Sequence, residues 1–104
     1  MRQVEVEEVF SSKPRMKILK LLARLGMLNV SDIAKRIGLN YSATNEHLRL
    51  LEAEGILVQR SYGRVRMYRF NEGSAKAKAV QSLIEAWEQA NNSNTIPDRR
   101  GITI

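Results

Sequence analysis

The residues with the clearest chemical potential in this chain are an asparagine and an arginine, Asn45 and Arg49, spaced four positions apart. That spacing places both side chains on one face of a helix. An asparagine amide can pair with two major-groove atoms of adenine, and an arginine with two acceptors of guanine. We expect both to contact DNA, and contact with a base or with phosphate stays open for each. The plainer alternative for Arg49 is an ion pair with Glu46 or Glu52.

Other polar residues share this predicted helix. Tyr41 and Ser42 open it, where free backbone N–H groups attract phosphate, so phosphate contact is their expected role. The single histidine, His47, is expected to pack or to contact phosphate, since no base or nucleophile is paired with it for catalysis.

A second basic group follows in residues 60–71, where arginines stand on both sides of a glycine. Arg60, Arg64 and Arg66 surround Gly63, and no acidic residue interrupts them. A glycine between alternating apolar residues predicts a β-hairpin. Charge on an exposed hairpin can serve only to block edge pairing. Beside a DNA-reading helix, contact with phosphate or the minor groove is the favoured interpretation.

The elements that would position these residues are marked by helix-ending signals. Ser12 with Pro14 predicts the start of a helix that stops at Gly26. Ser31 is expected to cap the next helix, which ends at Gly38. A reading helix then runs from Asn40 to Glu54 and leads into the hairpin. Residues 4–10 and 74–90 are expected to form the first and last helices.

An apolar stripe on the last helix predicts self-association. Val80, Leu83, Ile84 and Trp87 recur at helical spacing. A single helix cannot bury such a stripe on a small domain, so a dimer interface is favoured over a core position for Trp87. The residues expected at this interface are Val6, Val9, Phe10, Val80, Leu83, Ile84 and Trp87.

Composition excludes several classes of protein. The 104 residues suffice for one domain, and the net charge of +6 favours a polyanionic partner. With no cysteine, disulfides and thiolate metal sites are ruled out. No catalytic constellation or phosphate loop is visible, so neither an enzyme nor a cofactor is expected. Apolar runs are too short for a signal peptide or membrane span, and the default location is the cytoplasm.

The residues from Pro14 to Asn71 resemble the arsenical-resistance repressor (ArsR) type of winged helix. The matching residues are Gly38-Leu39, His47-Leu48, Leu50-Leu51-Glu52, Gly55-Ile56-Leu57, Gly63-Arg64 and Tyr68-Arg69-Phe70-Asn71. The resemblance implies a homodimer built from the first and last helices, with the fourth helix in the major groove and the wings reaching outward. It also implies that Tyr41, Ser42, Asn45, Glu46 and Arg49 lie on the DNA side.

One departure from this family excludes one class of effector. Metal-sensing members use cysteine pairs near the reading helix or His, Asp and Glu sets on the last helix. Here Glu72, Glu85 and Glu88 have no histidine partner. We therefore reject transition-metal sensing, and the effector stays unidentified.

These observations predict a mainly α winged helix-turn-helix with a small β-hairpin, in the order α-α-α-α-β-β-α. Residues 1–90 would bind DNA and dimerise, and residues 91–104 would form a polar flexible tail. The expected function is that of a homodimeric, sequence-specific regulator of transcription that binds double-stranded DNA and acts as a repressor. The alternatives are a sequence-neutral architectural DNA binder and a winged-helix module for protein assembly.

Overall fold

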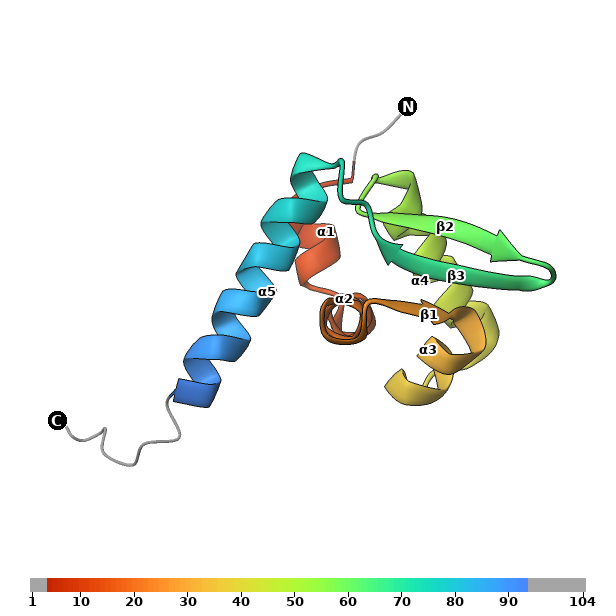
Figure 1. Ribbon diagram of the computed structural model, residues 1–104, viewed down its shortest axis with the longest axis horizontal. Coiled ribbons are helices and arrows are strands. Elements are labelled where there is room, and N and C mark those ends of the chain that lie inside the picture. The colour runs from red at the N-terminus through yellow and green to blue at the C-terminus, as the bar shows by residue number, and fades with distance from the viewer. Residues whose placement is uncertain (1–3, 94–104) are drawn as a thin grey trace, which may run out of the picture.

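The computed structural model describes residues 4–93, which form a winged helix-turn-helix (Figure 1). The elements in chain order are α1 (Val6–Phe10), α2 (Lys13–Leu25), β1 (Met27–Asn29), α3 (Val30–Ile37), α4 (Tyr41–Ala53), β2 (Leu57–Tyr62), β3 (Val65–Phe70) and α5 (Ala75–Ser93). The predicted helices and hairpin are confirmed. The strand β1, which precedes α3, was not predicted.

The helix-ending signals explain most of these boundaries. The Ser12 hydroxyl accepts a hydrogen bond from the Arg15 backbone N–H at 3.3 Å, and Gly26 ends α2 with a positive φ of 91°. The predicted cap of the third helix is wrong. The side chain of Asn29, not of Ser31, accepts from the Asp32 N–H at 2.8 Å. Asparagine caps as well as serine does, and it stands where the chain leaves β1.

The sheet has three antiparallel strands in the order β1-β3-β2. The short strand β1 pairs with β3, so that Leu28 lies opposite Tyr68. Strand β3 therefore has a partner on each side, and the exposed part of the hairpin extends beyond β1 as the wing (Figure 1). The base of the hairpin, from which the wing extends, is therefore held by three strands rather than two.

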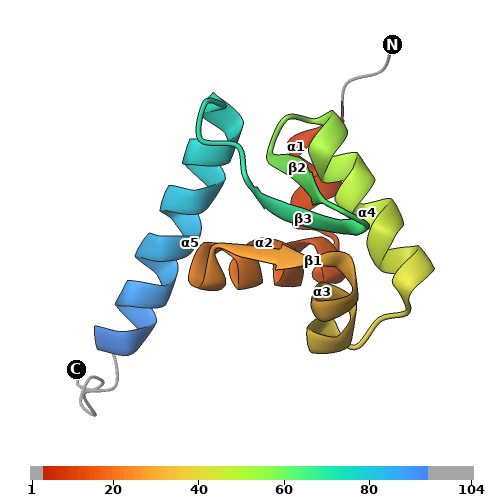
Figure 2. The same ribbon diagram turned by 45° about the vertical axis from the view of Figure 1, so that its right-hand side comes forward.

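The core surrounds α2, which runs through the middle of the domain and packs against α1, α3, α4, α5 and β3 (Figure 2). Its inner residues Ile18, Leu19 and Leu22 are buried. The predicted core residues Tyr68 and Phe70 of β3 are buried as well. Each fully buried side chain of this kind contributes about 1.5–3 kcal/mol to the stability of the fold.

The last helix continues further than predicted. It ends at Ser93 rather than near Ala90, so the first three residues assigned to a flexible tail are helical. Asn91 and Asn92 are weak helix formers, but neither breaks a helix as glycine or proline would. Residues 94–104, the rest of that tail, lie outside the described residues. Among residues 4–93, no helix is long and apolar enough to cross a membrane.

Candidate nucleic-acid interface

The helix-turn-helix consists of α3, a tight turn and α4. Gly38 adopts the left-handed conformation that this turn requires, with φ 72° and ψ 40°. The side chain of Asn40 then caps α4 by accepting from the Ala43 N–H at 2.8 Å. Because both ends of the turn are fixed, the start of α4 has one defined direction relative to α3.

Two rows of side chains run along opposite sides of α4. Thr44, Leu48 and Leu51 are buried against the core. The five residues predicted to contact DNA lie on the outer side, where Tyr41 is 50% exposed and Asn45 is half-buried: Tyr41, Ser42, Asn45, Glu46 and Arg49. The outer row is therefore open to a ligand along the first two turns of the helix.

The outer residue Arg49 is exposed, and within residues 4–93 it makes no hydrogen bond or ion pair. The ion pair considered from the sequence is not formed. Glu52 instead accepts a hydrogen bond from the buried Tyr68 hydroxyl at 3.3 Å. Burial of Tyr68, together with the nearby Glu52 charge, raises the pKa of this phenol, which keeps it a donor. Arg49 is left with all its donors available to a ligand.

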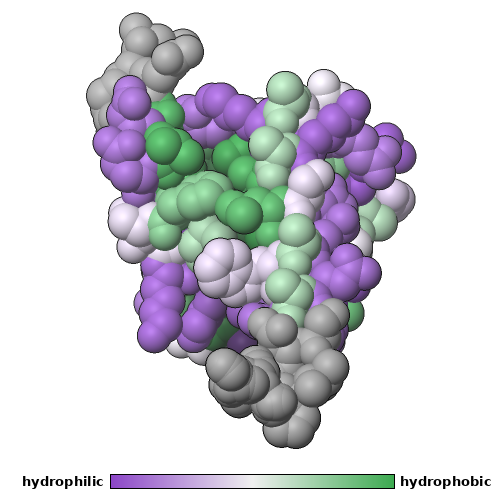
Figure 3. All heavy atoms as spheres, turned by 90° about the vertical axis from the view of Figure 1, so that its left-hand side faces the viewer, coloured by the Kyte–Doolittle hydropathy of each residue, from purple (hydrophilic) through white to green (hydrophobic). Residues whose placement is uncertain are grey.

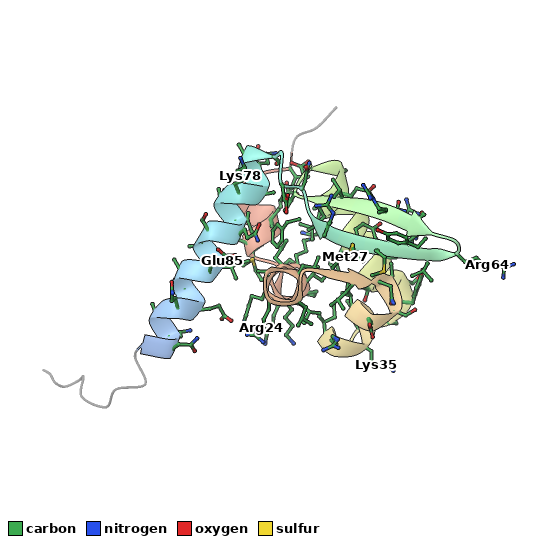
Figure 4. The ribbon with its side chains drawn as sticks, in the orientation of Figure 1. Arg24, Met27, Lys35, Arg64, Lys78 and Glu85 are labelled. Atoms are coloured by element: carbon green, nitrogen blue, oxygen red, sulfur yellow. The ribbon has the colours of Figure 1, made fainter. Side chains whose placement is uncertain are left out.

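The wing carries one arginine at its tip and one on each of its two faces. Arg64 is at the tip beside Gly63, and its side chain points away from the body of the domain (Figure 4). Arg60 lies opposite Met67 in the sheet register, whereas Arg66 lies opposite Ser61. Directly paired residues share a face and successive residues alternate, so Arg60 and Arg66 occupy opposite faces of the hairpin. Of the three, Arg66 is on the face that turns toward α4.

Arg66 bridges the wing and the reading helix. Its Nη2 donates to Asn45 Oδ1 at 2.5 Å and to the Tyr41 hydroxyl at 3.5 Å. The hydrogen bond to Tyr41 is the main cause of a raised Arg66 pKa, so this guanidinium stays charged. This contact was not predicted from the sequence, because it joins residues 21 positions apart. The only available signal was strand alternation, which places Arg66 on the same face as Tyr68.

His47 takes part in a second bridge, on the inner side of α4. Its Nδ1 accepts from Arg15 Nε at 3.2 Å, and Arg15 Nη1 donates to the backbone carbonyl of Glu8 at 2.5 Å. Arg15 thus joins α1, α2 and α4. Burial and then the Arg15 charge lower the pKa of His47, although Glu46 opposes them. The neutral imidazole is the form that accepts from Arg15, so His47 has a packing role.

The lowered pKa of His47 gives a prediction for stability against pH. The unfolded chain binds the proton more readily than the folded one, so the histidine contribution is fully present above the ordinary histidine pKa of 6.5 and is lost as pH falls through the folded pKa. We expect His47→Gln, whose amide oxygen can accept from Arg15 without titrating, to lose less stability between about pH 7.5 and about pH 5.5, values on either side of the usual pKa. Urea unfolding of both proteins measures this. Equal losses would contradict the prediction.

The acidic residues of the last helix do not gather into a metal site. Glu88 pairs with Arg24 at 2.6 Å, and this contact holds α5 to the end of α2. Among residues 4–93, no group of three or more His, Cys, Asp or Glu side chains is arranged to hold a metal ion.

The predicted dimer residues fall into two groups. Val9, Val80 and Ile84 are buried in the core of the monomer, whereas Val6, Phe10, Leu83 and Trp87 are exposed. The exposed group gathers on one face along α1 and α5, where an apolar area is visible between polar rims (Figure 3). Phe10 and Leu83 line two neighbouring grooves on this face. Four of the seven predicted residues can therefore meet a partner.

Comparison with known proteins agrees with this arrangement. Residues 12–58 match the family model described as bacterial regulatory protein, arsR family. The chain is 29% identical over 84 residues to the arsenical resistance operon repressor of Escherichia coli K12, a match that spans 81% of this chain and 71% of that protein.

Solved structures show the same fold. The AntR antimony-specific transcriptional repressor is 26% identical, with a TM-score of 0.68 over 83% of this chain and 73% of its own. The homodimeric winged helix-turn-helix DNA-binding domain Mb0332 of Mycobacterium bovis, a possible ArsR-family regulator, is 24% identical, with a TM-score of 0.67 over 83% and 77%. At that level of identity the second likeness establishes the fold alone.

Proposed function

We propose that this transcriptional regulator, whose residues 12–58 match the ArsR family, binds a specific double-stranded DNA site as a homodimer and acts there as a repressor. The observation that carries the proposal is the outer row of α4, where exposed Arg49 makes no hydrogen bond or ion pair within residues 4–93 and a wing with three arginines stands alongside. A helix that presents polar side chains beside a basic wing fits the major groove and the adjacent backbone.

Each α4 would lie in a major groove, with Asn45 and Arg49 directed at base edges and Tyr41 and Ser42 at phosphate. The N-terminal turn of α4 supports the second role, because its backbone N–H groups favour anions. Arg60, Arg64 and Arg66 would hold the wing on phosphate or in the minor groove. Glu46 would approach the groove as well, where a carboxylate accepts from cytosine. We place the protein in the cytoplasm with the DNA it binds.

The apolar face on α1 and α5 supports the homodimer. Val6 and Trp87 are each 65% exposed, and large apolar side chains gathered on one face mark a contact surface. A two-fold dimer presents the same face of each copy to the other. With that symmetry, the two α4 helices would enter successive major grooves about 34 Å apart.

Selection from a random DNA pool tests the proposal. We expect an imperfect palindrome whose half-sites are about one helical turn apart. Arg49→Ala should reduce binding to the selected site more than binding to random duplex, because removal of a bidentate base contact reduces discrimination by about 1–3 kcal/mol. Arg64→Ala is the matched control, since removal of a phosphate contact weakens all sequences alike.

Two other results would favour the alternatives. Retention of DNA without an enriched motif would indicate a sequence-neutral architectural binder. Failure to retain any duplex would indicate an assembly module. The exposed Arg64 at the wing tip favours DNA over the second alternative, because its charge and N–H donors suit a phosphate group.

A further inference from the structure

The side-chain amide of Asn45 has a fixed orientation before any DNA is bound. Its oxygen accepts from Arg66 Nη2 at 2.5 Å. A guanidinium has donors and no acceptor, so the amide must turn its oxygen, and never its nitrogen, toward Arg66. No residue within 4–93 accepts a hydrogen bond from the amide nitrogen. The group that Asn45 has to offer a ligand is therefore an N–H donor pair.

This orientation changes which base Asn45 can read. Bidentate pairing with adenine requires the amide oxygen to accept from the adenine amino group while the amide nitrogen donates to N7. Here that oxygen is engaged by a cation, and a positive charge beside it opposes the approach of an amino group. Guanine presents two acceptors, N7 and O6, on the same edge. An amide that offers only donors, next to a guanidinium, matches guanine better than adenine.

We propose that Arg66 is a positioning residue that sets the base preference of Asn45, so that Asn45 selects a G·C pair over an A·T pair. The inference rests on the proposed function, because it assumes that α4 enters the major groove. An isolated asparagine would be expected to pair with adenine. Here the wing residue Arg66 makes guanine the expected partner of Asn45.

The sheet explains why Arg66 can hold this position. It lies two residues before Tyr68 on the same face of β3, and Tyr68 is fully buried. Tyr68 in turn donates to Glu52 of α4, and Tyr41 of α4 accepts a second hydrogen bond from Arg66. Strand β3 is thus attached to α4 at both ends of the outer row. Arg64, two residues nearer the tip, has no described contact with α4.

The experiment selects binding sites from a random pool with the full chain and with Asn45→Ala, Arg66→Met and Arg64→Met. The position whose base preference disappears in Asn45→Ala is the pair that Asn45 reads. At that position we expect the wild-type chain to favour G·C over A·T by about tenfold, within the range of a single base contact. Arg66→Met keeps an unbranched, largely aliphatic side chain but removes the charge and the N–H donors, so the preference should move to A·T. Arg64→Met should lower affinity and leave the preference unchanged.

The contrary outcomes distinguish failure of this inference from failure of the proposed function. If the wild-type chain prefers A·T at that position, the inference is wrong, and no Arg66 variant is needed to show it. The inference is also wrong if the G·C preference persists in Arg66→Met, or if Asn45→Ala selects the same sites as the wild-type chain. A chain that retains no duplex at all refutes the proposed function itself. Thermal unfolding followed by circular dichroism checks that the Arg66→Met domain is folded.

Discussion

Replacing Leu83 and Trp87 by glutamate is expected to give a monomer that binds the preferred duplex at least about 100-fold more weakly than the wild-type chain, because the two half-site interactions are no longer linked. The two side chains are 43% and 65% exposed on α5, so they contribute little to the core of their own monomer. In a two-fold interface each new carboxylate would be buried beside apolar groups and near its own symmetry mate.

Sedimentation equilibrium and titration of the duplex measure the two effects. The matched control is the pair Ser82→Glu and Gln89→Glu, which adds the same charge to exposed positions of α5 away from the apolar face. This control separates loss of the interface from repulsion between the added charge and DNA. A double variant of Leu83 and Trp87 that stays dimeric would refute the interface, as would a wild-type chain that is monomeric at micromolar concentration.

The local parts of the fold could be predicted because their causes are local. Ser12, Gly26 and Gly38 end or begin helices through contacts within one turn, and these boundaries are confirmed. The burial of Leu48 and Leu51 also follows from helical spacing alone. The outer face of α4 was predictable for the same reason, since it is the side opposite those leucines.

The features that were missed depend on contacts between distant parts of the chain. Strand β1 has only three residues and exists because it pairs with β3, so its own sequence holds no periodic signal. Asn29 caps α3 because β1 delivers it there. The contact between Arg66 and Asn45 likewise requires the wing to fold against α4, which no spacing within either element reveals.

The apolar stripe of α5 shows a third limit of sequence patterns. Helical spacing identified the apolar residues but could not divide them between the core and the surface. Val80 and Ile84 are buried where α5 packs on the domain, whereas Leu83 and Trp87 lie one row over and are exposed. The division is set by the angle at which α5 crosses the domain, and that angle is a property of the packed structure.

Binding to duplex DNA is expected to weaken steeply with salt. If about six phosphates are neutralised by each dimer, log K should fall with log salt at a slope of about −5, so that a roughly threefold rise in salt lowers affinity about 250-fold. The cations responsible would include those of the wing, since Arg60 and Arg64 are exposed and the net charge of the chain is +6. Fluorescence anisotropy titrations at a series of salt concentrations measure the slope.

A variant at the wing tip tests whether this salt dependence arises from phosphate contacts of the wing. Arg64→Ala should flatten the slope by about one unit for each phosphate that is no longer neutralised, which is about two units for a dimer with two wings. Arg24→Ala is the matched control, because Arg24 pairs with Glu88 and lies well away from Arg64 (Figure 4). Its removal should leave the slope unchanged. An equal change for both arginines would mean that the overall charge, rather than the wing, drives binding. A wild-type slope near zero would mean that the wing meets a protein instead of DNA.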